Sequence, residues 1–251
     1  LPWLATTGDY DRLDYSTSAG ITVDLSTREV TVTGEAGVDR YSGIEEIHGA
    51  TNAPDLIRGR TASGNTDVLE GGRQMTLTLF GGSDTVEVSP HGWQQPWTDG
   101  IYVNYWWSKT AVDLKYVGDQ ATVTYGASGT QLAGTDTLKR VPHITDSAGS
   151  DRFDFSAATR THYGTADSDP PLFWTWAGVT LGRGGDDTVK GSGQDEAYTY
   201  LALGNYASSA TGQGVNADLK AGFIDLSHLG RVGGGAGGTV TFDSITGLFG
   251  T

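Results

Sequence analysis

The sequence predicts an all-β protein built as a parallel β-solenoid, that is, a β-helix or β-roll in which each coil of the chain stacks on its neighbours. Three observations predict it: a short turn motif recurs, the runs between the turns have strand composition, and the order of these runs repeats. A β-sandwich also needs many short alternating strands, so it is the alternative architecture.

The composition allows a folded core and excludes several classes of partner. Of the 251 residues, 37% are hydrophobic and 38 are glycine, and the formal net charge is −14. A surface with this charge repels nucleic acid phosphates and anionic lipids, but it suits cations. The chain has no cysteine, which excludes disulfides and thiolate metal sites. No apolar run reaches the roughly 20 residues of a membrane span.

The turn motif is glycine, any residue, aspartate, any residue, apolar residue. Glycine takes positive φ without steric cost, the aspartate offers oxygens to a cation or to the backbone, and the apolar residue starts a strand and points inward. Six strict copies begin at Gly37, Gly82, Gly134, Gly149, Gly185 and Gly193. The last two copies are almost adjacent, so we expect them to form neighbouring turns.

The strand-like runs repeat in a fixed order. The segments 21–25, 111–114 and 215–219 come first, with Asp24, Asp113 and Asp218 in equivalent places. Runs rich in Thr and Val follow at 30–33, 121–124 and 239–242, and isoleucine-centred segments follow these at 42–49, 141–145 and 243–247. The first two units also share a later pair, 75–86 and 177–189. We therefore expect one repetitive β domain over 1–251, with units of about 8–98, 99–192 and 193–251, the last one truncated. No amphipathic helix is expected.

The region from Gly8 to Gly71 resembles a known family. The segments Leu13-Asp-Tyr-Ser16, Ile21–Leu25 and Ser42-Gly-Ile-Glu45 occur in the same order as in the degenerate repeats that flank hemolysin-type (repeats-in-toxin, RTX) calcium-binding blocks. This resemblance implies a parallel β-solenoid, calcium binding, and secretion as part of a larger extracellular bacterial protein. The chain departs from the family because its copies rarely stand in tandem, and because Val240 stands where an aspartate is expected in the third unit.

The turn motif provides candidate calcium ligands. They are Gly185, Asp187, Gly193 and Asp195 in the tandem pair, and Asp39, Asp84, Asp136 and Asp151 in the isolated copies. Ca²⁺ needs about six to eight oxygens, which two stacked turns can supply as carboxylates and backbone carbonyls. The alternative is that each aspartate closes an Asx-turn on its own backbone.

Aromatic stretches indicate a second kind of site. Tryptophan rings pack against sugar faces, so a carbohydrate-binding surface is the alternative function, with Trp106, Trp107, Trp174 and Trp176 as candidates. Trp106 and Trp107 are adjacent, so we expect them to face opposite sides of a strand. The other interpretation is that these rings anchor the core or cap its ends.

Paired acids allow a third function, a polysaccharide-modifying enzyme of the lyase or epimerase type. The pairs are Glu45/Glu46, Asp167/Asp169 and Asp186/Asp187, with Lys109, Lys115 or Arg160 as a basic partner. No established catalytic motif is present, so we assign no catalytic residue. The five histidines lack zinc-site spacing, and we expect His48 and His143 to be structural.

The function expected from these features is a secreted, non-catalytic calcium-binding module that is a structural or adhesive part of a larger extracellular protein. Its partners would be calcium ions and a polysaccharide or cell surface. The chain begins Leu-Pro-Trp and ends within a repeat unit. We therefore expect further domains of a parent chain, or a partner that covers the open edge.

Overall fold

The structure is a computed structural model, and it describes residues 10–59, 75–88, 101–141, 143–158, 175–192, 197–203, 216–227 and 237–249. All regular structure within these ranges is β-strand, which confirms the predicted all-β class. In the same ranges, no helix has the length and apolar character needed to cross a membrane.

One sheet has eight strands, and every neighbouring pair in it is parallel. Its spatial order is β1 (Arg12–Asp14), β5 (Glu46–His48), β7 (Met75–Thr78), β9 (Ile101–Val103), β13 (His143–Thr145), β15 (Thr175–Leu181), β17 (Ala197–Leu203) and β21 (Gly247–Phe249). Because parallel neighbours cannot be joined by tight hairpins, the chain must leave this sheet between successive strands.

The other sheet has thirteen strands and mixes parallel with antiparallel pairs. Its spatial order is β18 (Asn216–Asp218), β19 (Phe223–Asp225), β20 (Thr239–Asp243), β16 (Asp187–Lys190), β14 (Arg152–Ala158), β10 (Val112–Gly118), β11 (Gln120–Tyr125), β12 (Gly134–Lys139), β8 (Thr85–Glu87), β6 (Leu56–Arg58), β2 (Ile21–Asp24), β3 (Glu29–Val32) and β4 (Asp39–Arg40). The antiparallel pairs belong to three meanders, β2–β3–β4, β10–β11–β12 and β18–β19–β20. All other pairs are parallel.

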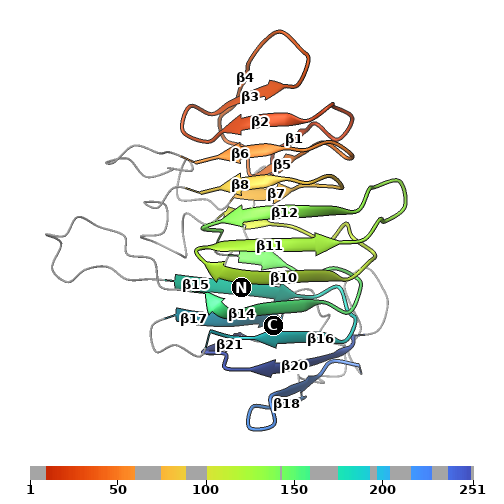
Figure 1. The fold of residues 1–251 in the computed structure, drawn as a ribbon, viewed down its shortest axis with the longest axis vertical. Helices are drawn as coiled ribbons and strands as arrows, with labels where there is room; N and C mark the ends of the chain where they lie inside the picture. Colours follow the sequence, from red (N-terminus) through yellow and green to blue (C-terminus); the bar gives the residue numbers. More distant parts are fainter. Residues whose placement is uncertain are drawn as a thin grey trace, which may run out of the picture.

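The strands stack along the longest axis of the molecule, with β4 at one end and β18 at the other (Figure 1). Alternation sets which side chains face inward. In β10, Val112, Leu114 and Tyr116 are buried, whereas Asp113 and Lys115 are exposed. This period of two is the strand period that the sequence pattern predicted.

The core consists of apolar columns that run across the strands. In the eight-stranded sheet the strand register places one apolar residue of each strand in a single column: Leu13, Ile47, Leu77, Val103, Ile144, Val179, Leu201 and Leu248. The six central members are fully buried, and the two end members are only partly buried. Burial of each such side chain contributes about 1.5–3 kcal/mol, so stacking of strands is the main stabilising term.

The three meanders occupy equivalent places, but the sequence alignment was wrong at Asp113. Val23, Leu114 and Ala217 are equivalent, because the residue with which each pairs is paired in turn with Asp39, Asp136 or Val240 in the third strand of its meander. The position of Asp24 and Asp218 is therefore taken by Lys115 in the second meander. The β10–β11 hairpin carries two further residue pairs before its turn, which the short aspartate-centred alignment did not allow for.

The alignment of 239–242 with 121–124 was also wrong. Phe223–Asp225, which is β19, takes the place of β11, and Thr239–Asp243 takes that of β12. The Asp218 carboxylate accepts hydrogen bonds from the N–H groups of Lys220 and Ala221, and the chain reverses there. Only three residues form β19, so its strand signal in the sequence was weak.

Candidate functional site

Buried aspartates form two ladders across the thirteen-stranded sheet. In each ladder, the backbone N–H of one aspartate donates to the carboxylate of the aspartate in the next strand. The first ladder contains Asp55, Asp84 and Asp136, and the second contains Asp151 and Asp187. We refer to these two groups as the aspartate ladders. Four of the five residues belong to the predicted turn motif, and Asp55 does not.

The first ladder joins four strands. Asp84 Oδ1 accepts the N–H of Asp55 at 2.8 Å, and Asp136 Oδ1 accepts the N–H of Asp84 at 2.9 Å. At one end, the two oxygens of Asp55 accept the N–H groups of Ile21 and Ala50, both at 2.8 Å. The carboxylates thus satisfy N–H groups at the starts of the parallel strands, where strand pairing leaves them without an acceptor.

Two tyrosines close the other end of the first ladder. The hydroxyls of Tyr105 and Tyr125 donate to the two oxygens of Asp136 at 2.7 and 2.8 Å. Asp136 therefore accepts three hydrogen bonds at a position with no exposed surface. Such donors partly replace the water that a buried carboxylate loses.

The second ladder repeats this arrangement in the next unit. Asp151 accepts the N–H of Val112 at 2.7 Å and that of Ser147 at 2.6 Å, and Asp187 Oδ1 accepts the N–H of Asp151 at 2.9 Å. Asp187 then pairs with Val240, just as Asp84 pairs with Asp136. This confirms that Val240 stands at the expected aspartate position, and it explains why the second ladder is one residue shorter.

The ladder aspartates differ from the Asx-turn alternative. Asx-turns onto the local backbone occur instead at aspartates outside the motif, such as Asp24 with Ser26 and Asp154 with Ser156. Each ladder carboxylate accepts at least one N–H group from a distant part of the chain, and Asp55 and Asp151 accept a nearby N–H group as well. Parallel, in-register stacking is the reason, because it places one motif aspartate directly opposite the next.

Burial perturbs the ladder carboxyls strongly. It raises the pKa of Asp55 and of Asp151 to about 6, and that of Asp187 to about 9. Burial, followed by the charges of Asp136 and Asp55, also raises the pKa of Asp84. Desolvation disfavours the charged form, and here it outweighs the hydrogen bonds that favour it. The ladders therefore hold protons at a pH where exposed aspartates are ionised.

One carboxylate oxygen remains unpaired in each ladder. Asp84 Oδ2 and Asp187 Oδ2 are buried and have no hydrogen-bond partner, and the two residues occupy equivalent positions. Asp84 is 1% exposed and Asp187 is 2% exposed. An ionised oxygen in such a place needs a proton or a cation to be stable.

Asp39 occupies the position of Asp136 in the first meander. Asp39 pairs with Val30 in the way that Asp136 pairs with Val123. Its Oδ2 accepts the hydroxyl of Tyr15 at 2.9 Å, matching the contact of Tyr105 with Asp136. Asp39 is exposed because β4 is the last strand of the sheet.

The motif glycines allow the turns before neighbouring strands to approach each other closely. A Cβ on Gly134 would overlap the backbone carbonyl of Gly82, and a Cβ on Gly185 would overlap that of Gly149. Gly185 also has φ +93°, a conformation that L residues rarely adopt. The glycine of the motif is thus required for contact between neighbouring turns as well as for the bend itself.

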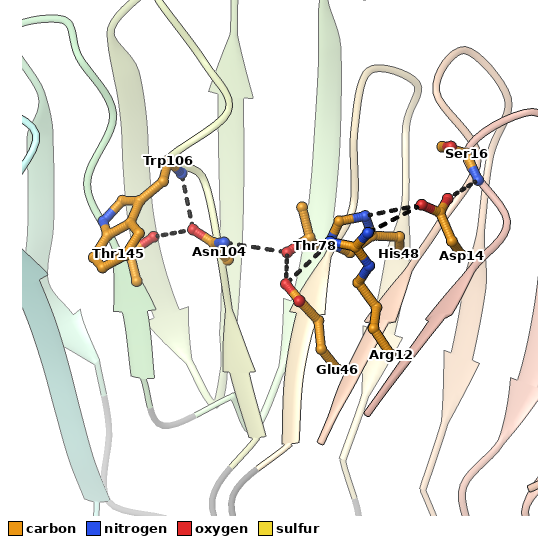
Figure 2. A network of polar contacts seen from close by, with 9 residues as sticks. All are labelled: Arg12, Asp14, Ser16, Glu46, His48, Thr78, Asn104, Trp106 and Thr145. Carbon is orange, nitrogen blue, oxygen red and sulfur yellow. Dashed lines mark hydrogen bonds and ion pairs between the residues drawn. The ribbon is translucent and has the colours of Figure 1, made fainter. Parts of the chain in front are cut away.

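A row of polar side chains crosses the eight-stranded sheet (Figure 2). Asp14, His48 and Thr78 lie in register on three parallel strands and alternate with core residues. Glu46 Oε1 lies 3.0 Å from His48 Nε2 and accepts the hydroxyl of Thr78 at 2.8 Å. The row continues through Asn104, which donates to the Thr78 hydroxyl at 3.1 Å.

The polar row ends at Thr145, whose hydroxyl donates to Asn104 Oδ1 at 2.9 Å. Its members thus bind one another across five strands, as a cross-strand ladder does. His143 lies on the same face, with Nε2 at 2.6 Å from the Thr180 hydroxyl, and burial lowers its pKa to about 3. By strand register, His143 corresponds to Glu46 and not to His48.

The two adjacent tryptophans lie in a turn after β9 and not in a strand as predicted, and their side chains contact different residues. Trp107 packs against the core and meets Tyr125 edge to face, with ring centroids 5.2 Å apart. Trp106 points elsewhere, and its Nε1 donates to Asp146 Oδ1 at 3.1 Å. The Arg183 guanidinium lies 5.2 Å from the Trp106 ring. Trp174 and the side chain of Trp176 lie outside the described parts of the chain.

Sequence reasoning missed Asp146 and Asp55. Asp146 Oδ2 accepts the N–H groups of Gly182 and Arg183 at 2.7 and 2.8 Å, and burial raises its pKa to about 7. Neither residue follows a glycine at the motif spacing. The usable signal for Asp146 was its place directly after the isoleucine-centred strand β13, whereas Asp55 lies well after β5 and had no such signal.

The acid pairs considered for an enzyme have structural contacts where they are described. The Glu45 carboxylate accepts the Asp11 N–H at 3.0 Å, and the Asp186 carboxylate accepts the Thr239 N–H at 3.0 Å. Lys109 and Lys115 lie in the β10–β11 part of the fold. Asp167, Asp169 and Arg160 lie outside the described residues.

Only the first half of the predicted tandem calcium-binding pair lies in the described part of the chain. Gly185 and Asp187 are described, whereas Gly193 and Asp195 lie outside the described residues. Within the described ranges, no group of three or more His, Asp or Glu side chains is arranged to hold a metal ion. Asp187 Oδ2 is nevertheless a free, buried oxygen of the kind that a hard cation prefers.

Comparison with known proteins adds no relative. The chain matches none of the protein-family models, and no curated protein is significantly similar to it. The function must therefore be argued from the aspartate ladders, the polar row and the sheet edges.

Proposed function

We propose that this chain is a non-catalytic structural module of a larger extracellular protein, coiled as a parallel β-solenoid. The observation that carries this proposal is the pair of aspartate ladders, which join successive parallel strands through Asp55, Asp84, Asp136, Asp151 and Asp187. Apart from the unpaired Oδ2 atoms of Asp84 and Asp187, the carboxylate oxygens of the ladders accept hydrogen bonds from backbone N–H groups or from side-chain hydroxyls. That arrangement suits a rigid spacer or adhesive stalk more than a catalyst.

Each coil contributes one strand to the parallel sheet and one or more strands to the mixed sheet. The meanders are then hairpin insertions that widen single coils. Their antiparallel strands give the mixed sheet its thirteen members against eight in its partner. A chain without cysteine depends on such stacked hydrogen bonds and apolar columns for its stability outside the cell.

Calcium binding is a second proposal, and the unpaired Oδ2 of Asp187 favours it. Asp187 would supply one oxygen, and the backbone carbonyls of its turn and Asp195 of the following turn would supply others. A bound ion would neutralise the buried charge and stabilise the folded state by linkage.

A melting experiment at pH 7.5 tests the calcium proposal. The proposal expects millimolar Ca²⁺ to raise the melting temperature by at least about 4 °C relative to excess chelator, and Asp187→Asn to abolish this rise. Asp24→Asn, a change at a partly buried Asx-turn outside the ladders, is the control and should keep the rise. Equal melting temperatures with calcium and with chelator would contradict calcium binding. The buried carboxyl of Asp187 would then be neutralised by a proton.

A further inference from the structure

Both ends of the strand stack expose residues whose counterparts in the described inner strands are buried. At one end, β1 and β4 are the last strands of the two sheets, and at the other end β21 and β18 are the last strands (Figure 1). We refer to these surfaces as the N-end face and the C-end face. The repeat makes it possible to say what would cover each one, because its counterpart inside the molecule is covered.

The N-end face presents Asp39 as an acceptor. Its counterpart Asp136 accepts the N–H of Asp84 from the adjacent parallel strand at 2.9 Å and has no exposed surface. Asp39 is held by Tyr15 in the same way but is exposed. Leu13 and Tyr41, beside it, are core residues that are only partly buried.

The C-end face presents an apolar edge. Leu219 is 65% exposed, whereas its counterpart Leu25 is 7% exposed. The N–H of Leu25 donates to the Arg58 carbonyl at 2.9 Å, so an adjacent parallel strand lies beside Leu25, whereas β18 is the last strand of its sheet. Leu248, the last member of the apolar column in the eight-stranded sheet, is also only partly buried.

The two faces match each other in strand direction. Every pair in the eight-stranded sheet is parallel, so β21 of one molecule can continue into β1 of another. In the thirteen-stranded sheet, β3 is antiparallel to both β2 and β4, so β4 runs in the direction of β2. Likewise, β19 is antiparallel to both β18 and β20, so β18 runs in the direction of β20. They therefore point the same way, and β18 can pair with β4 in parallel.

We infer that the partner of each face is the opposite face of a second copy of this chain, so that the molecules associate head to tail. Such a contact would continue both sheets, extend the apolar column from Leu248 to Leu13, and give Asp39 the kind of neighbour that Asp136 has. Because the interface is heterologous, repetition produces open chains and not closed dimers. This inference rests on the proposed coil architecture.

Charge opposes this contact at low ionic strength. Two bodies of formal net charge −14 repel each other, and added salt screens that repulsion. Association should therefore strengthen as salt rises, unlike an association held by ion pairs.

Sedimentation of the whole chain over rising protein concentration, at low and high salt, tests the inference. We expect the weight-average mass to rise to at least about twice the monomer mass at high salt. Asp39→Lys on the N-end face and Leu219→Lys on the C-end face should each remain monomeric. Arg40→Pro, also on β4, is a second N-end variant in case Asp39→Lys fails to fold.

Mixing the two single variants is the decisive arm. Asp39→Lys keeps an intact C-end face and Leu219→Lys keeps an intact N-end face, so an equimolar mixture should stop at about twice the monomer mass. Val117→Lys, a change at an exposed hairpin residue, is the control and should associate like the parent chain.

Three results would overturn the inference: a parent chain that stays monomeric at every concentration and salt, association unchanged in the end variants, or a mixture that remains monomeric. None of these would bear on the coil architecture itself. A parallel β-sheet signature in the circular dichroism and infrared spectra of the monomer tests that separately.

Discussion

Asp187→Asn should stabilise the protein much more at pH 8 than at pH 5. Asparagine keeps an oxygen that can accept the N–H of Asp151, but it carries no charge at any pH. Burial raises the pKa of Asp187 to about 9, whereas an unfolded aspartate has a pKa of about 3.9. Between these values the folded parent holds a proton that the unfolded chain has lost, so its stability falls as pH rises.

The size of this stability difference follows from the pH range between the unfolded and the folded pKa of Asp187. Each pKa unit corresponds to about 1.4 kcal/mol, so the parent loses at most about 4 kcal/mol at this residue between pH 5 and pH 8. Local opening and water entry reduce this limit, and we expect a difference of about 1–3 kcal/mol. The amide NH₂ group that replaces the unpaired carboxylate oxygen has no hydrogen-bond acceptor. This lowers the stability by about the same amount at both pH values, because an amide does not titrate.

Urea unfolding in chelator, followed by tryptophan fluorescence at pH 5 and pH 8, measures this difference. Asp186→Asn is the matched control, because Asp186 is exposed and its hydrogen bonds to Thr239 lower its pKa. Its effect should not change between the two pH values. If Asp187→Asn has the same effect at both values, or destabilises more at pH 8, the assignment of a buried, protonated carboxyl is refuted.

The parent chain should be most stable near about pH 4. The raised pKa values of Asp55, Asp146, Asp151 and Asp187 make stability fall as pH rises from about 4, and these four carboxyls outweigh the single His143, whose lowered pKa makes stability fall as pH drops from about 6.5 towards 3. Melting temperature as a function of pH checks this, and an optimum at or above pH 8 would contradict it. Gly185→Ala should destabilise by at least about 2 kcal/mol, because φ is +93° and the new Cβ overlaps the Gly149 carbonyl. Gly34→Ala, at φ +83° with open space around it, is the control and should lower stability by about 1 kcal/mol from backbone strain alone. Equal losses of stability would show that the close approach of the Gly149 carbonyl is not the reason for glycine at 185.

The strands were predictable where alternation was strong. Val112, Leu114 and Tyr116 alternate with polar residues, and the structure places them in one buried face of β10. The turn motif also singled out Asp84, Asp136, Asp151 and Asp187, as candidate calcium ligands, and the structure places all four in the aspartate ladders, while their binding of calcium stays a prediction. Local pattern suffices in these cases because a period of two has only one way to bury its apolar face.

The partners of those aspartates could not be read from the sequence. An aspartate after a glycine suits a metal, its own backbone or a neighbouring strand equally well, and only the register between distant strands decides. Asp136 receives the N–H of Asp84, 52 residues away in the chain, and this depends on β12 lying beside β8. The third meander was misaligned for a related reason, since β19 is short and its pairing is set by neighbouring strands.

The most direct test of the account is the titration of aspartate side-chain carboxyl carbons by ¹³C NMR. The account predicts midpoints near pH 6 for Asp55 and Asp151 and near pH 9 for Asp187, with Asp24 and Asp154 below the usual value for aspartate. Midpoints near pH 4 for all five carboxyls would show that the ladder carboxyls are solvated, and would contradict the buried aspartate ladders.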